Sequence, residues 1–357
     1  KLSRIPHYEP GTSLDDAKAR AETADAVKLA SNESPFPPHP AVVDAIARAA
    51  GGINRYPDPE ARALRRAIAD HHETDPARIA VSNGSCELLL AAALALCEEG
   101  DEILFAWPSF SIYPYLAPLC GAREIRVPLG EGYVHDLDAM LEEVTAATQL
   151  LIVCNPNNPT ATHIPAERIG AFIEGVPDRT TIILDEAYIE YQTNDDPDTT
   201  LDLLAQHPNV VLLRTFSKCH GLAGLRVGYA LCSPQFRSAV DAVRQPFSVN
   251  TLAQVAATEA IRHQDDVAER VERNIVEKVF VEEELRELGF TTADSQANFA
   301  WINLGELDEE EVVESLTKAG VAVRPGTPLG GPGHLRVTYG THAENERFLD
   351  AMRSLAS

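Results

Sequence analysis

Four groups of polar residues stand directly after short apolar runs of this chain. The richest group lies within residues 212–229, where an apolar run is followed by two hydroxyls, an amine, several glycines and an arginine. Hydroxyls, backbone N–H groups beside glycines and a guanidinium are common donors to phosphate. The amine of Lys218 could act as a nucleophile or a base. The combination predicts a phosphate-bearing ligand beside a reactive lysine, although a single lysine next to glycines is more often a surface residue.

The other three polar groups each allow a role in ligand binding and a plain structural role. Gly84 and Ser85 open a helix-forming stretch and could present backbone N–H groups to a phosphate, but a simple helix cap by Ser85 explains them equally well. Residues 154–161 contain two Asn-Pro steps after an apolar run, which is rarer than a single asparagine-proline turn. Asp185 ends another apolar run, where a buried carboxylate needs a partner. A helix cap or a metal ligand is the plain alternative for Asp185.

The elements that position these groups form an alternating pattern. Strands are expected at 79–82, 102–106, 150–154, 181–184, 210–214 and 227–231, and helices at 41–50 and 60–71. Continuous apolar strands separated by amphipathic helices predict an α/β fold with a mainly parallel sheet that is covered on both faces. Ligands of such sheets lie beyond the carboxyl ends of the strands. The four polar groups are therefore expected to converge there.

Three segments are expected along the chain. Residues 1–40 are irregular and proline-rich and form an N-terminal arm, residues 41–250 form the large domain, and residues 251–357 form a smaller α+β domain. Within the last segment we expect one long helical region at 251–288, strands at 299–304 and 335–339, and a helix at 309–319. The acidic run 308–311 is interpreted as the first turn of that helix rather than a metal site.

Composition excludes several classes of protein. The chain has 357 residues, 45% of them hydrophobic, and a formal net charge of −24. That charge disfavours nucleic acid and anionic membranes as partners. Such a charge is expected for a soluble protein whose molecules repel one another, and adaptation to high salt is the alternative explanation. The six cysteines contain no C-x-x-C pair, and no leader or membrane-spanning run is apparent, so we expect a cytoplasmic protein without a metal centre. The glycines after Lys218 are not spaced for a dinucleotide.

Together the four groups resemble the motifs of the fold-type I, class II aminotransferases, which use pyridoxal 5′-phosphate (PLP), and the resemblance covers nearly the whole chain. It implies the PLP-dependent transferase fold, with a large domain built on a mainly parallel sheet and a smaller α+β domain. It also implies that Lys218 is the catalytic residue that attaches the cofactor. Asp185 would pair with the pyridine nitrogen, and Asn158 and Tyr188 would reach the phenolic oxygen.

The resemblance implies further contacts with the cofactor. Phe110 would stack on its ring, and Tyr56 would reach the phosphate bound by the other subunit of a homodimer. The remaining phosphate contacts would come from Gly84, Ser85, Cys86, Thr215, Ser217 and Arg226. The chain departs from the family pattern at Cys86, where an acid is common, and at Ala161, where glycine is usual.

Within that family the chain is similar to the histidinol-phosphate aminotransferases, on the residues 7–11, 29–36, 55–58, 323–326 and 335–341. This likeness implies an amino donor and a 2-oxo acid acceptor, histidinol phosphate and 2-oxoglutarate, in histidine biosynthesis. Arg336 would bind the acidic group of the substrate, and Arg324 and Tyr8 would help to hold the phosphate or carboxylate. A phenylalanine or general aromatic aminotransferase of the same family is equally compatible with the chain, including its residues 246–250 and 295–299.

Two alternatives come from other classes of protein. A PLP-binding protein without catalysis, such as a regulator, would resemble an aminotransferase fused to a DNA-binding domain, for which the acidic chain offers no counterpart. A PLP-dependent lyase or decarboxylase on the same fold is a closer competitor. Arg336 and the combined motifs favour transamination over both.

Overall fold

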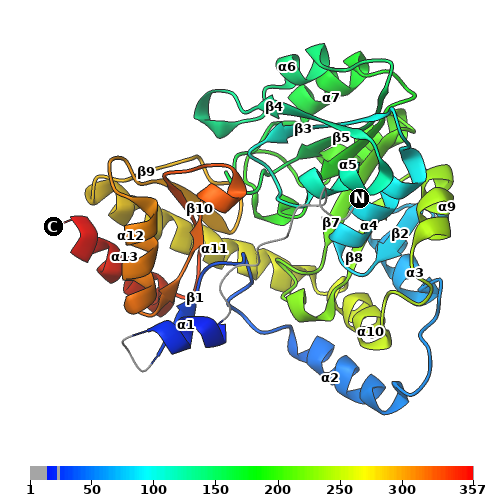
Figure 1. Ribbon diagram of the computed structural model, residues 1–357. Coiled ribbons are helices and arrows are strands. Elements are labelled where there is room, and N and C mark those ends of the chain that lie inside the picture. The colour runs from blue at the N-terminus through cyan, green and yellow to red at the C-terminus, as the bar shows by residue number, and fades with distance from the viewer. Residues whose placement is uncertain (1–13, 22–24, 357) are drawn as a thin grey trace.

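The computed structural model describes residues 14–21 and 25–356 of the chain (Figure 1). Its centre is a seven-stranded sheet with the order β2-β8-β7-β6-β5-β3-β4. The strands are β2 (Ile79–Ser82), β3 (Glu102–Trp107), β4 (Arg123–Pro128), β5 (Thr148–Cys154), β6 (Thr181–Asp185), β7 (Val210–Thr215) and β8 (Gly228–Leu231). Neighbouring strands from β7 to β4 are parallel, and β8 is antiparallel to both strands beside it, β2 and β7. The predicted mainly parallel α/β sheet is therefore confirmed.

Strand β4 was not predicted, and its position explains why. It lies at the edge of the sheet, beside β3 alone, and among its residues only Val127 is buried. An edge strand is covered incompletely, so it does not need the continuous apolar run by which the central strands were recognised.

Helices cover both faces of this sheet (Figure 1). One apolar core gathers α2 (Pro40–Ala49), α3 (Arg62–His71), α6 (Leu137–Glu142), α7 (Ala166–Gly175), α8 (Thr199–Gln206) and α10 (Thr251–Ala260). The opposite core gathers α4 (Ser85–Leu96), α5 (Tyr113–Cys120) and α9 (Pro234–Val243). Leu151 and Val153 of β5 enter the first core, whereas Leu150 and Ile152 enter the second. Because successive strand residues point to opposite faces, both sets must be apolar.

A smaller unit follows, with its own core. Its four-stranded sheet has the order β12-β13-β10-β9 and is antiparallel throughout. The strands are β9 (Thr291–Thr292), β10 (Phe299–Asn303), β12 (Arg324–Pro325) and β13 (His334–Thr338), and the helices are α11 (Gln264–Glu287), α12 (Glu309–Lys318) and α13 (His342–Ala356). The arm is tied to this unit, because β1 (Val27–Lys28) pairs with β11 (Val321–Ala322). The other described elements are α1 (Leu14–Arg20) and 3-10 turns at Ala50–Gly52, Pro76–Arg78, Glu131–Tyr133, Ile189–Tyr191, Ala223–Leu225 and Thr327–Leu329.

The region 251–288 contains two helices rather than the single helical region that was expected. Helix α10 ends at Ala260 and α11 begins at Gln264. The alanines of α10 are buried in the core of the large sheet, and α10 contacts α2 and α3. Helix α11 instead contributes Val281 and Leu285 to the core of the small unit. The domain boundaries stay a prediction, and this packing leads us to propose that the boundary at 250 moves to about 263.

The acidic run 308–311 forms the start of α12, as the sequence indicated. Asp308 caps α12, and its Oδ1 accepts the backbone N–H groups of Glu310 and Glu311, both at 3.0 Å. Within the described ranges no three His, Cys, Asp or Glu side chains are grouped so that they could hold a metal ion. The same residues include no helix long and apolar enough to cross a membrane.

Candidate active site

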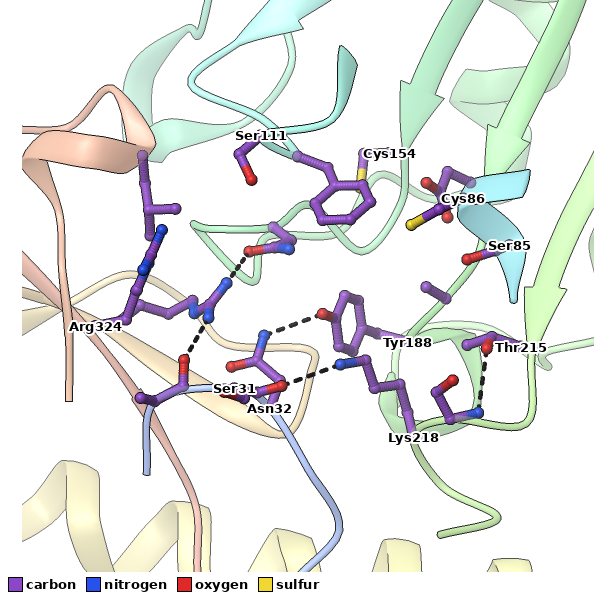
Figure 2. Close-up of a pocket in the computed structure, with 18 of the residues that line it drawn as sticks. Ser31, Asn32, Ser85, Cys86, Ser111, Cys154, Tyr188, Thr215, Lys218 and Arg324 are labelled. Carbon is purple, nitrogen blue, oxygen red and sulfur yellow. Dashed lines mark hydrogen bonds between the residues drawn. The ribbon is translucent and has the colours of Figure 1, made fainter. Parts of the chain in front are cut away.

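A cavity of about 230 Å³ lies at the carboxyl ends of the parallel strands, facing the small unit (Figure 2). Cys154, Asp185 and Thr215 line it, and each is the last residue of its strand, β5, β6 or β7. Most of the predicted site residues line the same cavity, namely Ser85, Cys86, Phe110, Asn158, Asp185, Tyr188, Thr215, Ser217, Lys218, Arg226, Arg324 and Arg336. The expected convergence of the polar groups is therefore observed.

Asp185 is buried, with 2% of its surface exposed, and among the described residues only one of its carboxylate oxygens has a hydrogen-bond partner. Oδ2 accepts a hydrogen bond from the hydroxyl of Tyr113 at 2.8 Å. Oδ1 is buried without a hydrogen-bond partner among the described residues. Burial raises the pKa of the carboxyl to about 6, although the Tyr113 hydroxyl opposes this shift. A ligand that brings a positively charged N–H group to Oδ1 would relieve the cost of this buried charge.

Lys218 follows β7 and is held by the arm. Its Nζ donates to the carbonyl oxygen of Ser31 at 3.2 Å and lies 5.4 Å from the centre of the Tyr188 ring (Figure 2). Burial, together with the positive charge of Arg336, lowers the pKa of this amine to about 7. A substantial fraction of the amine is then neutral near neutral pH, which a nucleophile or a base requires.

One side of the cavity carries groups that could hold an anion. The first turn of α4, at Ser85 and Cys86, presents backbone N–H groups that have no partners within the helix. Arg226 lies beside it, and its Nη1 donates to the Ser217 hydroxyl at 3.2 Å. A side chain on Gly84 would meet Arg226 Nη2 at 2.3 Å, and Gly84 has a φ of +77°. Gly84 therefore does not line the cavity itself but allows the guanidinium to approach the helix terminus.

The opposite side carries the two predicted arginines of the small unit. Arg324 on β12 and Arg336 on β13 are register partners, and they are 6% and 8% exposed. Arg336 donates to the Oδ1 of Asn158 at 2.6 Å and to the carbonyl oxygen of Ala30 at 2.7 Å. Arg336 thus joins the small unit, the Asn-Pro turn and the arm. Ala161 in that turn has a φ of +62°, the left-handed region that suits glycine.

One described residue of the predicted site, Tyr56, lies away from this cavity. It is 82% exposed and stacks on Phe247 at 4.6 Å between ring centres, on the surface of the chain. Its predicted contact is with the cofactor of another subunit. Tyr8 lies outside the described residues.

Several lining residues were not predicted. Ala30, Ser31 and Asn32 belong to the run 29–36, which the sequence analysis singled out without assigning roles to them. Ser111 and Leu329 belong to no motif, and nothing in their local sequence points to the site. Tyr113 of α5 does not line the cavity, but its hydroxyl contacts Asp185, and this residue was not predicted either.

The family model described as "Aminotransferase class I and II" matches residues 24–352 of the chain. The chain belongs to this aminotransferase family. Among its relatives, the aromatic amino acid aminotransferase of Cutibacterium acnes is 40% identical over 98% of this chain and 95% of its own length. The histidinol-phosphate aminotransferase of Rubrobacter xylanophilus is 41% identical over 99% of this chain and 98% of its own.

A solved structure supports the same assignment. The histidinol-phosphate aminotransferase of Sinorhizobium meliloti, crystallised with PLP, has a TM-score of 0.89 and 30% identity, over 99% of this chain and 97% of its own. The aminotransferase family and fold predicted from the motifs are therefore confirmed. The site of this aminotransferase suits that ligand. Around one cavity it holds the Lys218 amine, the Asp185 Oδ1 that has no partner among the described residues, and the possible anion site of Ser85, Cys86, Ser217 and Arg226, which we call the anion cradle.

Proposed function

We propose that this aminotransferase uses PLP to move an amino group from histidinol phosphate to 2-oxoglutarate. The observation that carries the proposal is the buried Oδ1 of Asp185, which lacks a partner among the described residues in the same cavity as the Lys218 amine. A carboxylate in that state suits the protonated ring nitrogen of PLP. When bound, PLP withdraws electrons from the Cα of the amino donor.

The roles that we propose for the protein fall on residues named in the sequence analysis. Lys218 Nζ would hold the cofactor and, as a neutral amine, would take the proton from the donor's Cα. Asp185 would keep the ring nitrogen protonated. Ser85, Cys86, Thr215, Ser217 and Arg226 would hold the phosphate, Phe110 would cover the ring, and Asn158 and Tyr188 would bind the phenolic oxygen. Arg336, with Arg324 and Tyr8, would bind the anionic end of the substrate.

The choice of donor is supported by the two buried arginines. A phosphate monoester carries close to two negative charges at neutral pH, which Arg324 and Arg336 together can balance. The alternative donor is an aromatic amino acid such as phenylalanine, which presents a single carboxylate. The names of relatives such as the Cutibacterium acnes enzyme favour this alternative, so a direct comparison is required.

That comparison should separate the donor from the acceptor. We expect kcat/KM for histidinol phosphate to exceed that for phenylalanine by at least about tenfold, or ~1.4 kcal/mol of transition-state discrimination, with 2-oxoglutarate as acceptor. The half-reaction with each donor alone, followed by cofactor absorbance, removes the contribution of the acceptor. Arg324→Gln should slow the half-reaction of histidinol phosphate more than that of phenylalanine. A tenfold preference for phenylalanine would overturn the donor and leave the reaction class intact.

The anion cradle gives a second prediction. Arg226→Gln should weaken PLP binding by about 10- to 100-fold, because a charge-assisted hydrogen bond contributes about 1.5–3 kcal/mol. The measurement is a titration of the cofactor-free protein with PLP. Arg66→Gln on the exposed face of α3 is the matched control and should leave the dissociation constant unchanged. Equal affinities for the two variants would contradict the phosphate assignment.

We also propose that the protein is a homodimer in the cytoplasm. The exposed rings of Tyr56 and Phe247 stack on each other, and a second copy would cover this apolar pair. Ile53, three residues before Tyr56, is 63% exposed as well. In that arrangement Tyr56 would reach the partner's phosphate site. All six cysteines are free thiols in the structure, which supports a reducing compartment.

A further inference from the structure

Asn32 occupies an unusual position at the junction of three parts of the chain. It is 1% exposed and has a φ of +52°, a left-handed conformation that asparagine tolerates better than most residues. Its backbone N–H donates to Thr338 Oγ1 of β13 at 2.9 Å, and its carbonyl oxygen accepts from Asn298 Nδ2 at 3.2 Å. Its side-chain Nδ2 donates to the Tyr188 hydroxyl at 3.0 Å (Figure 2). The arm, the small unit and the large sheet therefore meet at this residue.

The hydroxyl of Thr338 fixes which end of the Asn32 amide faces Tyr188. Thr338 Oγ1 already accepts the Asn32 backbone N–H, so its own hydrogen is available to a second acceptor. That acceptor is Asn32 Oδ1, at 3.3 Å. With the amide oxygen turned to Thr338, the NH₂ group is turned to Tyr188, and the opposite orientation would place two donors against each other.

The consequence concerns the single proton of the Tyr188 hydroxyl. Because Asn32 donates to the Tyr188 oxygen, the Tyr188 hydrogen cannot be directed at Asn32 and remains available to an acceptor in the cavity that Tyr188 lines. We propose that Asn32 is a positioning residue that keeps Tyr188 a hydrogen-bond donor to the phenolic oxygen of the bound cofactor. This inference rests on the proposed function, since it requires PLP in the cavity.

The neighbourhood of Tyr188 makes the effect measurable. Its titratable neighbours are Lys218 after β7, Arg336 on β13, Asp185 on β6 and Cys154 on β5. Asn32 and Thr338 carry no charge, so replacing Asn32 by another neutral residue changes the hydrogen bond and leaves those charges in place. A donor on the phenolic oxygen stabilises its anionic form, and removing the donor should raise the pH at which the cofactor's visible absorption titrates.

The test uses the PLP-loaded protein and its absorption as a function of pH. Asn32→Gly keeps the left-handed backbone and removes the amide, and it should raise the titration midpoint by about 0.5–1 pH unit, the size expected from one neutral hydrogen bond. In the Tyr188→Phe background the Asn32→Gly change should move the midpoint by less than about 0.2 unit, since the group through which it acts is gone.

If Asn32 only stabilised the fold, its variants would change the melting temperature and not specifically the titration midpoint. Asn298→Ala removes a hydrogen bond to the Asn32 carbonyl oxygen but none to Tyr188, so it serves as the matched control. It should lower the melting temperature while the midpoint stays in place, and Thr338→Ser, which keeps the hydroxyl, should change neither. Equal midpoint shifts with and without Tyr188, or no shift in Asn32→Gly, would overturn the inference. Failure of the wild-type protein to show the visible band would instead refute the proposed function.

Discussion

Lys218→Ala is expected to reduce transamination by about 10⁴-fold or more, the upper range for loss of a positioned general acid–base. The reason is that Lys218 alone among the lysines lines the cavity as the structure describes it. A cation elsewhere cannot replace an amine that must both attach the cofactor and move a proton. The visible absorption of the covalently held cofactor should also disappear, and borohydride reduction of the wild-type protein should label the peptide that contains Lys218.

The control for this variant is a lysine in a different setting. Lys318→Ala removes an exposed ion pair with Glu314 on α12 and should leave both activity and absorption unchanged. Retention of the visible band in Lys218→Ala, or label on another peptide, would disprove the assignment.

The pH dependence of cofactor attachment follows from the buried amine. Burial lowers the pKa of Lys218 to about 7, so the neutral form increases as the pH rises through that value. The rate at which the cofactor-free protein takes up PLP covalently should therefore rise between about pH 6 and 8 and then level off. A rate that continued to rise towards pH 10 would indicate a lysine with an ordinary pKa.

Asp185→Asn is expected to lower kcat by about 10²- to 10³-fold, the size found when one preorganised electrostatic contact is removed from a buried site. Asparagine keeps the shape of the side chain, and its Oδ1 can still accept from the Tyr113 hydroxyl. A neutral amide does not favour the protonated ring nitrogen as a carboxylate does. The measurement is kcat at saturating substrate, together with the absorption spectrum of the bound cofactor.

A measurement of the stability of Asp185→Asn shows whether its loss of kcat comes from unfolding. The pKa of Asp185 is about 6 in the folded protein, above its ordinary value of 3.8, so the penalty on the folded state builds up as the pH rises from 3.8 to about 6 and is complete above that. The cofactor-free Asp185→Asn protein should accordingly be at least as stable as the wild type at pH 8. Tyr113→Phe removes the donor to Oδ2 and leaves the carboxylate, so its loss of kcat should be about tenfold or less. Asp185→Asn activity within about threefold of the wild type would contradict the pairing.

The sequence determined the large sheet and one side of the site. Central strands of a covered parallel sheet must be apolar on both faces, so β5, β6 and β7 could be recognised as continuous runs. Their carboxyl ends lie at one edge, and the residues that follow them, such as Asp185 and Lys218, therefore gather without any knowledge of loop geometry. Polar side chains directly after a continuous apolar run are easy to recognise in the sequence, because the buried strand itself excludes them.

Tertiary structure decided the features that depend on partners distant in the chain. The edge strand β4 and the break between α10 and α11 follow from which surfaces are covered, a property that local periodicity does not encode. Tyr113 reaches Asp185 only because α5 packs over the strand ends. The orientation of the Asn32 amide depends on Thr338, which lies 306 residues later in the chain. Hydrogen bonds are directional and short, so such contacts are fixed by the folded geometry and not by residue type or spacing.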